Sequence, residues 1–466
     1  LYELLIVFIP LFTIPYVSRV LGAENIGLFS YTYAVANYFV LFANLGIKNY
    51  GSRTIAMVRN NKEELNRNFS EILSIHIIFS IIVIFVYLVL LFFFVEDNLV
   101  IFLIQSIYVF AAVFDINWFF FGIEKFKLTV GRNTLVKILS VFLVLVFVKT
   151  QTDLWIYALI LALSVFVGQS VVWFALKQYV SWRRPSWANM KQHIRPLFVL
   201  FLPILALSLY KYMDKIMLGS ISSNVQVGFY ENAEKIINVP MSLIMAFGVV
   251  LMPRIANMVT SKDKGEVFKL IDMSMEAVML LAIAISFGLA GISFVLAPIF
   301  FGYEFEECGI LIMGLAVTVP FMAFANVIRT QYLIPYKEDK IFVVSLFLGA
   351  AVNLIVNIIL IPYMAARGAV IGTIFAEIIV CIYQSYFVRK KIFIKKYLLN
   401  TIPPILIGIV MFVFVFQIGN VMNINIVTLI LQLLVGMFIY AVGVFLLMLK
   451  SRTRLMVLLR KFVVRY

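Results

Sequence analysis

The sequence predicts an all-α polytopic membrane protein with about fourteen transmembrane helices. Two observations carry this prediction. Hydrophobic residues make up 64% of the 466 residues and the mean hydropathy is +1.05, values that a water-soluble domain does not reach. Lys and Arg also gather in every second gap between the apolar stretches. Helix is the expected state because backbone groups in lipid must pair within their own segment, and these apolar runs are too long for barrel strands.

The charge pattern predicts which loops face the cytoplasm. Most of the 38 Lys and Arg residues follow the second, fourth, sixth, eighth, tenth and twelfth stretches or lie in the tail beyond Lys450. The other gaps carry only Arg19, Lys149 and Arg367. Lys and Arg mark cytoplasmic loops, so both termini are predicted to lie inside. The net charge of +15 therefore reflects topology and attraction to anionic lipid, and nucleic acid is not an expected partner.

The predicted spans follow one another with short gaps. They begin near residues 1, 26, 71, 99, 131, 153, 197, 233, 268, 309, 341, 367, 399 and 425. An internal repeat relates the first six to the next six, because Leu21-Gly22 and Ile26-Gly27 are echoed by Leu218-Gly219 and Val227-Gly228. An even number of spans in each copy predicts two parallel, pseudo-symmetric six-helix lobes.

The repeat also predicts the domain boundaries. We expect an N-terminal lobe over residues 1–180 and a C-terminal lobe over residues 196–392. Two additional helices should follow over residues 398–450, with a basic cytoplasmic tail over residues 451–466.

Polar residues recur on single faces of apolar spans. At 100° per residue, the second span places five of them within a sector of about 60°. These residues are Ser30, Tyr33, Asn37, Asn44 and Lys48. Span twelve likewise carries Glu377 between Thr373 and Gln384. The pattern indicates either a hydrated cavity between lobes or interhelical hydrogen bonds, and the repetition in matched helices favours the cavity.

Span seven carries Lys211, Asp214 and Lys215, whose i, i+3 and i+4 spacing puts them on one face. Intramembrane charges are costly and typically mark substrate or ion pathways. The repeat register places Arg19 of span one close to Lys215, so we predict that the two cations face each other across the outward mouth and bind an anion. The alternative is a structural role at the helix ends.

The remaining titratable residues give weaker signals. Asp115 precedes the aromatic run that starts at Trp118, which predicts either an interfacial anchor with a cap or part of an inner gate or proton site. His76 is expected to be a satisfied interhelical partner, and His193 a loop residue. With two Cys and two His in the chain, neither a disulfide framework nor a metal site is expected. Nucleotide-binding and hydrolase motifs are absent, so we expect a transporter and no enzyme or cofactor.

Several motifs resemble those of the multidrug/oligosaccharidyl-lipid/polysaccharide (MOP) exporter superfamily, and within it the Wzx-type polysaccharide flippases. They are residues 15–22 running into Ile26-Gly27, residues 44–53, 118–122 and 214–219, and residues 368–373 before Glu377. The resemblance covers essentially the whole chain. It implies two lobes that open alternately to each face of a bacterial cytoplasmic membrane. The implied cargo is an undecaprenyl-diphosphate-linked oligosaccharide that moves from the inner to the outer leaflet.

This cargo gives each candidate residue an expected role. Arg19, Lys211 and Lys215 would meet the diphosphate or an acidic sugar. Ser30, Tyr33, Asn37 and Asn44 would line the sugar path. Lys48 and Arg53 would capture the head group at the cytoplasmic mouth, with positive-inside anchoring as the alternative. Asp115, Asp214 and Glu377 are candidates for coupling or gating, and coupling to H⁺ or Na⁺ stays open.

Two other functions remain as alternatives. A drug or metabolite exporter of the same superfamily would hold an essential carboxylate in a smaller cavity. A membrane glycan polymerase or ligase would need a sizeable outer loop with catalytic groups, whereas the outer gaps here are short. Expected partners are membrane lipids and, from the resemblance, the glycosyltransferases and polymerase of one assembly pathway.

Overall fold

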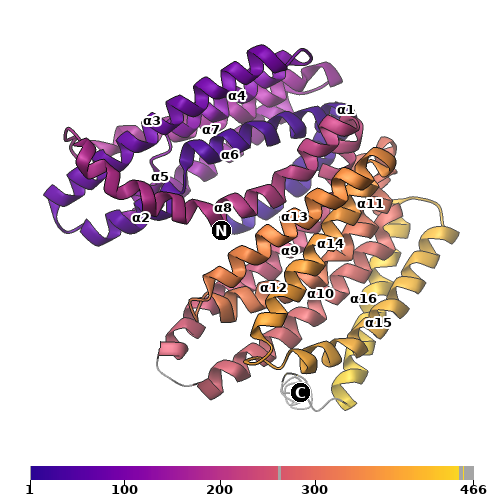
Figure 1. Ribbon diagram of the computed structural model, residues 1–466. Coiled ribbons are helices and arrows are strands. Elements are labelled where there is room, and N and C mark those ends of the chain that lie inside the picture. The colour runs from indigo at the N-terminus through magenta and orange to yellow at the C-terminus, as the bar shows by residue number, and fades with distance from the viewer. Residues whose placement is uncertain (1, 261–263, 451–454, 456–466) are drawn as a thin grey trace. The chain divides into compact units, whose positions relative to one another are not determined.

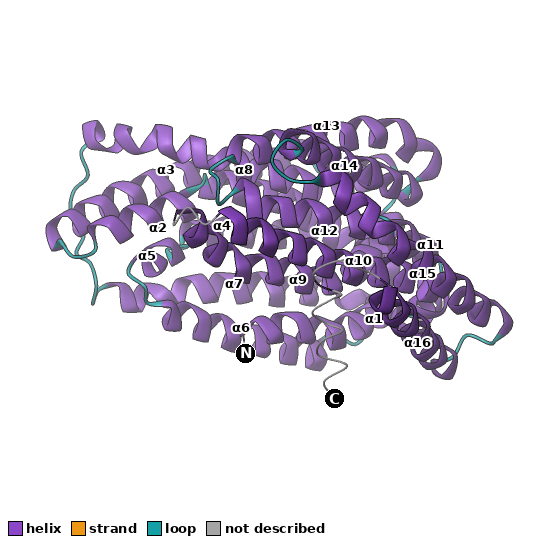
Figure 2. Ribbon diagram, turned by 90° about the horizontal axis from the view of Figure 1, so that it is seen from below, coloured by secondary structure: helices purple, strands orange, loops and turns teal. Residues whose placement is uncertain are grey.

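The computed structural model describes residues 2–260, 264–450 and 455, and the regular elements in these ranges are helices (Figure 2). Thirteen helical segments of the described chain are long and apolar enough to cross a membrane. The predicted all-α class with many membrane spans is therefore confirmed. The tail predicted over residues 451–466 lies outside the described residues, apart from Leu455.

The chain divides into two compact units, Leu1–Gly219 and Ser220–Tyr466 (Figure 1). The helices of the first unit are α1 (Tyr2–Asn44), α2 (Ile47–Val58), α3 (Lys62–Phe94), α4 (Leu99–Val113), α5 (Asn117–Gly122), α6 (Phe126–Phe147), α7 (Leu154–Leu176) and most of α8 (Trp187–Ile221). The boundary between the compact units falls inside α8, whereas the repeat places the start of its second copy at the beginning of this helix.

The second unit contains the remaining helices. They are α9 (Asn224–Thr260), α10 (Lys264–Phe301), α11 (Cys308–Ala316), α12 (Thr318–Ile328), a π-helical segment (Arg329–Leu333), α13 (Asp339–Met364), α14 (Ala366–Val388), α15 (Ile394–Val421) and α16 (Ile426–Lys450). Helix α13 packs along α14, and α15 packs on α10 and α16. Met411 and Val415 of α15 form a small core with Ile292 of α10.

Two glycines shape the first helices. Helix α1 breaks at Gly22 (φ 77°, ψ 172°), so its two halves correspond to the first two predicted spans. The second half ends at Asn44, and Gly46 adopts a left-handed conformation (φ 73°) before α2 begins. A Cβ atom at Gly46 would lie 2.8 Å from the Leu197 carbonyl oxygen, so the corner requires glycine. The prediction that the second span carries Lys48 is therefore wrong, because this corner moves Lys48 onto α2.

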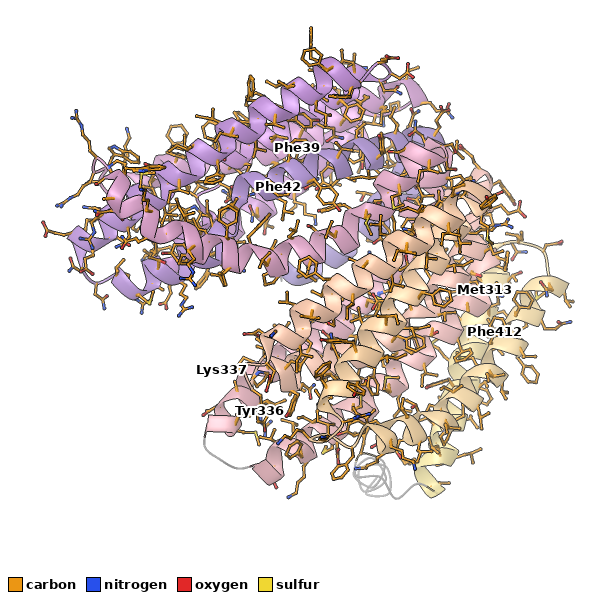
Figure 3. The ribbon with its side chains drawn as sticks, viewed as in Figure 1. Phe39, Phe42, Met313, Tyr336, Lys337 and Phe412 are labelled. Carbon is orange, nitrogen blue, oxygen red and sulfur yellow. The ribbon has the colours of Figure 1, made fainter. Side chains whose placement is uncertain are left out.

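Aromatic residues form the core of the first unit. Trp118, Phe119 and Phe120 are almost completely buried, and the Phe69 ring lies 5.6 Å from that of Trp118. The aromatic run therefore belongs to the core and is not an interfacial anchor. A separate cluster forms where Phe39 of α1, which is labelled in Figure 3, meets Tyr87 of α3 edge-on.

The basic gaps of the first unit lie at one end of its helix bundle. Arg59, which follows α2, forms an ion pair with Glu124 between α5 and α6. Arg183, between α7 and α8, forms an ion pair with Glu63 at the start of α3, with an N–O distance of 3.1 Å. This common end agrees with the alternation of charge along the sequence.

Candidate functional site

A polar and aromatic surface forms where α1 and α8 meet within the first unit, and we call it the α1/α8 seam. Its α1 residues are Tyr33, Asn37 and Tyr38, and its α8 residues are Lys211, Tyr212, Asp214 and Lys215. Ser30, one turn before Tyr33 on α1, is 4% exposed. The helices approach closely at Gly219, where a Cβ atom would lie 2.3 Å from the Tyr31 ring. The absence of a side chain at Gly219 thus lets α8 pass directly over α1.

Contacts across the seam join residues that are about 180 positions apart in the sequence. The Tyr38 and Tyr212 rings meet edge to face, with centroids 6.0 Å apart. The Tyr33 hydroxyl interacts electrostatically with Lys211 and Lys215, and Tyr38 interacts in the same way with Asp214. The structure therefore brings the predicted polar face of span two together with the predicted charged face of span seven.

The charges of the seam are partly buried and do not balance. Asp214 is 4% exposed and Lys215 is 8% exposed, whereas Lys211 is exposed. Two ammonium groups thus share the seam with one carboxylate. Each charge held in a membrane span costs about 2.5–3.5 kcal/mol on insertion scales. The exposed Lys211 ammonium adds a positive charge to the buried Lys215 and Asp214, and this suits an anionic ligand.

Aromatic side chains extend the seam beyond the predicted residues. The Tyr33 ring stacks on Phe29 at 5.6 Å and meets Tyr108 of α4 edge-on at 5.1 Å. The Asn37 amide donates to the Tyr33 carbonyl oxygen at 2.8 Å. Tyr108 was missed from the sequence because nothing local distinguishes it from other aromatic residues of α4. Tyr38 follows the predicted residue Asn37, and Tyr212 follows the predicted residue Lys211. These neighbours in the sequence were the only signal that the two tyrosines belong to the site.

The other predicted binding residues lie outside the seam. Arg19 is exposed on the first half of α1. Its position opposite the buried Lys215 stays a prediction. Asn44 is half-buried at the last position of α1. Lys48 and Arg53 are exposed on α2. Lys48 and Arg53 thus lie on a different helix from the lysines of the seam.

Asp115 belongs to a second polar network of the first unit. Its Oδ1 atom accepts hydrogen bonds from the backbone nitrogen and the side-chain amide of Asn117, at 3.0 and 2.7 Å. The same amide donates to Gln169 Oε1 of α7 at 2.8 Å, and Arg132 Nη2 of α6 donates to Asn117 Oδ1 at 3.1 Å. The carboxylate therefore caps the α4–α5 turn and is connected to two further helices.

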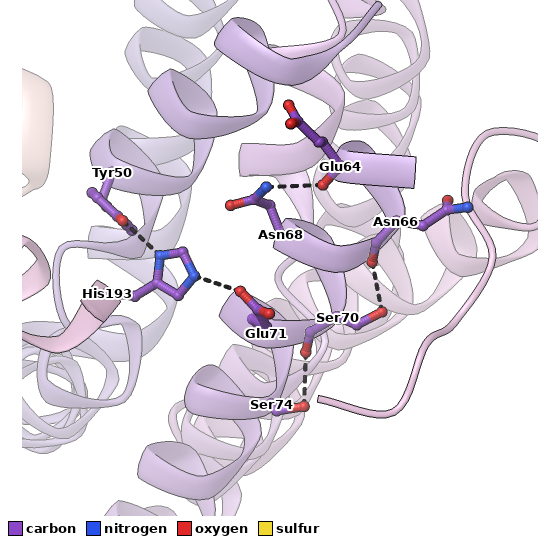
Figure 4. A network of polar contacts seen from close by, with 8 residues as sticks. All are labelled: Tyr50, Glu64, Asn66, Asn68, Ser70, Glu71, Ser74 and His193. Carbon is purple, nitrogen blue, oxygen red and sulfur yellow. Dashed lines mark hydrogen bonds and ion pairs between the residues drawn. The ribbon is translucent and has the colours of Figure 1, made fainter. Parts of the chain in front are cut away.

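A third network joins α2, α3 and α8 near the basic end (Figure 4). His193 Nε2 lies 2.9 Å from Glu71 Oε2, and the Tyr50 hydroxyl lies 2.6 Å from His193 Nδ1. The Glu71 and His193 side chains are only 1% and 3% exposed. We call these three residues the Glu71–His193 cluster. The prediction that His193 is a loop residue is wrong, because α8 begins six residues earlier and buries it.

Glu377 lies in the second unit and is 5% exposed on α14. It interacts electrostatically with Arg329, the first residue of the π-helical segment. The Arg329 guanidinium also lies 5.4 Å from the centre of the Phe342 ring. Glu377 and Arg329 therefore form a pair of opposite charges within the second unit.

Long apolar helices with buried charges, amides and tyrosines on shared faces define a polytopic membrane transport protein. A family model described as polysaccharide biosynthesis protein matches residues 1–259, and the chain belongs to this family.

Similar proteins agree with this class. A candidate O-antigen transporter of Shigella dysenteriae is 24% identical over 390 residues, which cover 80% of this chain and 94% of the relative. The solved structure of the lipid II flippase MurJ in an inward closed conformation matches with a TM-score of 0.75 at 15% identity, over 96% of this chain and 97% of that one. An inward-facing multidrug resistance MATE transporter of the MOP superfamily matches with a TM-score of 0.65 at 14% identity, over 84% and 97%. The predicted MOP-type fold is therefore confirmed.

Proposed function

We propose that this protein is a flippase for undecaprenyl-diphosphate-linked oligosaccharide units of a surface polysaccharide, and that it works by alternating access. The α1/α8 seam is the observation that carries the proposal. It combines tyrosine rings and an amide, which suit sugars, with two lysines beside a single aspartate, which suit a diphosphate or an acidic sugar. The family and the name of the Shigella dysenteriae relative support the same class of cargo.

The residues of the seam have distinct roles in this proposal. Lys215 and Lys211 bind the anionic part of the cargo, and Asp214 limits the excess charge when the seam is empty. Tyr33, Tyr38 and the neighbouring amide contact the sugars. Arg19 attracts the head group to the outward mouth. Lys48 and Arg53 of α2 attract it to the inward mouth.

The lipid chain of the cargo needs an apolar surface. The second unit has an apolar groove of about 960 Å³ between α10, α15 and α16. Its lining includes Leu281 and Ile285 of α10, Met411 of α15, and Met437 and Phe445 of α16. This groove would accept a segment of the polyprenyl chain, because burial of apolar surface is its main source of binding energy.

The orientation in the membrane is also a proposal. We place both termini and the basic gaps in the cytoplasm of a bacterial cell and the protein in its cytoplasmic membrane. The ion pairs that gather three basic gaps at one end of the first unit support this orientation. Glycosyltransferases that build the cargo and a polymerase that consumes it would act before and after this step.

The test is transfer of labelled lipid between leaflets of reconstituted vesicles. Undecaprenyl-diphosphate oligosaccharide with a fluorescent sugar is placed in both leaflets, and a membrane-impermeant quencher reports the outer fraction over time. The proposal predicts transfer that depends on the protein and on the diphosphate. Failure to move several different oligosaccharides, together with efflux of small organic cations, would contradict it and favour the drug-exporter alternative.

A further inference from the structure

His76 lies in the apolar interior of α3, and its side chain is completely buried. Within the part of the chain that the structure describes, neither of its ring nitrogens has a hydrogen-bond partner. The expectation that His76 is a satisfied interhelical partner is therefore wrong. Buried polar groups nearly always have partners, so an imidazole without one indicates a site that is completed by something else.

The nearby titratable group is Asp115, with which His76 interacts electrostatically. Asp115 is held by the side chain of Asn117, which is in turn held by Gln169 of α7 and Arg132 of α6. The carboxylate thus has a fixed position and interacts electrostatically with a buried imidazole. The residues of this arrangement come from α3, α5, α6 and α7. Of these helices, α3, α6 and α7 are membrane spans that have no other role in the proposed cargo path.

The chemistry of these groups selects the ligand. The Asp115 Oδ1, Asn117 Oδ1 and Gln169 Oε1 atoms already accept hydrogen bonds. The Arg132 guanidinium also supplies a permanent positive charge one amide away from Asp115. Both features oppose a metal cation. A neutral imidazole, in contrast, has a lone pair that can take up a proton, and the resulting charge is stabilised by the neighbouring carboxylate.

We propose that His76 and Asp115 form a proton-binding site that couples leaflet transfer to a proton gradient. The inference rests on the proposed flippase function and adds the coupling ion and its position. The free lone pair of the His76 ring accepts a proton from water on one side of the membrane and returns it to water on the other side, so charge and atoms balance over a cycle. His76 is closed to solvent in this structure, and its exposure must therefore alternate with the conformation of the protein.

The charged surroundings of the site are defined. Asp115 of the α4–α5 turn interacts electrostatically with His76, and Arg132 of α6 is hydrogen-bonded to Asn117, which binds Asp115. On α3 itself, Glu71 lies five residues earlier and binds His193 of α8, which also contacts Tyr50 of α2. Protonation of His76 thus adds one positive charge to the His76–Asp115 pair, which already contains one carboxylate.

The test compares the steady-state leaflet distribution of labelled lipid with and without a pH gradient of one unit. Coupling of one proton to one cargo supports up to about tenfold enrichment in one leaflet, because one pH unit is a tenfold ratio of proton activity. The wild-type protein should approach this enrichment. His76→Gln and Asp115→Asn should give no more than equal labelling of the two leaflets. Ser80→Ala is the matched control, because Ser80 is an equally buried α3 residue whose hydroxyl has no hydrogen-bond partner in the described structure.

The outcomes separate this inference from the proposed function. If the wild-type protein moves no labelled lipid, the flippase function fails. If it moves lipid but ignores the gradient, or if either folded variant keeps the wild-type enrichment, the proton site is overturned. Loss of transfer in His76→Gln with intact enrichment in Asp115→Asn also overturns it. Size-exclusion profiles and thermal unfolding in detergent establish that each variant is folded.

Discussion

The Glu71–His193 cluster and the α1/α8 seam both bury charged groups in the first unit, but they are built differently. In the cluster, one carboxylate meets one imidazole at 2.9 Å, and a tyrosine hydroxyl contacts the second ring nitrogen at 2.6 Å. In the seam, Lys211, Lys215 and Asp214 of α8 interact electrostatically with Tyr33 and Tyr38 of α1. The first arrangement is complete without a ligand and joins three helices, whereas the second gains from binding an anion.

The largest expected effect is a loss of stability in the cluster. Glu71→Ala removes the acceptor of a buried imidazole, and breaking a buried pair in this way costs about 3–5 kcal/mol. Thermal or denaturant unfolding in detergent measures this loss, while transfer per folded molecule should stay close to the wild-type value. Glu63→Ala, which removes an exposed ion pair on the same helix, is the control and should cost at most about 1 kcal/mol. Equal stability of the two variants would contradict the structural role of the cluster.

Lys215→Ala should act in the opposite way. Loss of a charged hydrogen bond to the cargo weakens binding by about 1.5–3 kcal/mol, or roughly 10- to 150-fold, with little change in unfolding. The rate of leaflet transfer as a function of cargo concentration measures this effect. Lys125→Ala in an exposed basic gap is the matched control. Wild-type transfer by Lys215→Ala would remove the seam from the cargo path.

Tyr212 tests the aromatic part of the seam. Its ring meets Tyr38 edge to face, and such contacts are worth about 0.5–1.5 kcal/mol. Tyr212→Ala should therefore reduce transfer roughly two- to tenfold, whereas Tyr212→Phe should stay within about twofold of wild type. If both variants lose transfer equally, the hydroxyl rather than the ring is the functional group.

The smallest effect is expected outside both regions. Arg53 is exposed on α2, and exposed charges contribute little to binding or stability. Arg53→Ala should change transfer by less than about twofold at physiological ionic strength, and the remaining difference should disappear in high salt. A tenfold loss that persists in high salt would contradict a purely long-range attraction and indicate that Arg53 contacts the head group directly.

The sequence predicted the polar face of α1 and the charged face of α8 because helical spacing fixes which residues of one helix share a side. It could not predict that the two faces meet, since that contact depends on a close approach at Gly219. The corner at Gly46 and the burial of His193 were missed for the same reason. Local charge around residue 193 favours a loop, but α8 begins at Trp187 and continues through Pro196.

His76 gives the clearest case of information that only the structure holds. A single histidine in an apolar span is compatible with a bonded partner or with a free imidazole. The fold decides between them by burying His76 completely with no hydrogen-bond partner among the described residues, and by placing Asp115 within electrostatic range. Conversely, the all-helical membrane class was predictable because the length and hydropathy of an apolar segment do not depend on packing.

The most direct test of the account is leaflet transfer of labelled undecaprenyl-diphosphate oligosaccharide, expressed per folded molecule, for Lys215→Ala beside Glu71→Gln. The account predicts that Lys215→Ala is as stable as wild type but transfers at least about tenfold more slowly. It predicts that Glu71→Gln is less stable but transfers normally once folded. The reverse pattern, with slow transfer in folded Glu71→Gln and normal transfer in Lys215→Ala, would contradict the assignment of the cargo to the α1/α8 seam.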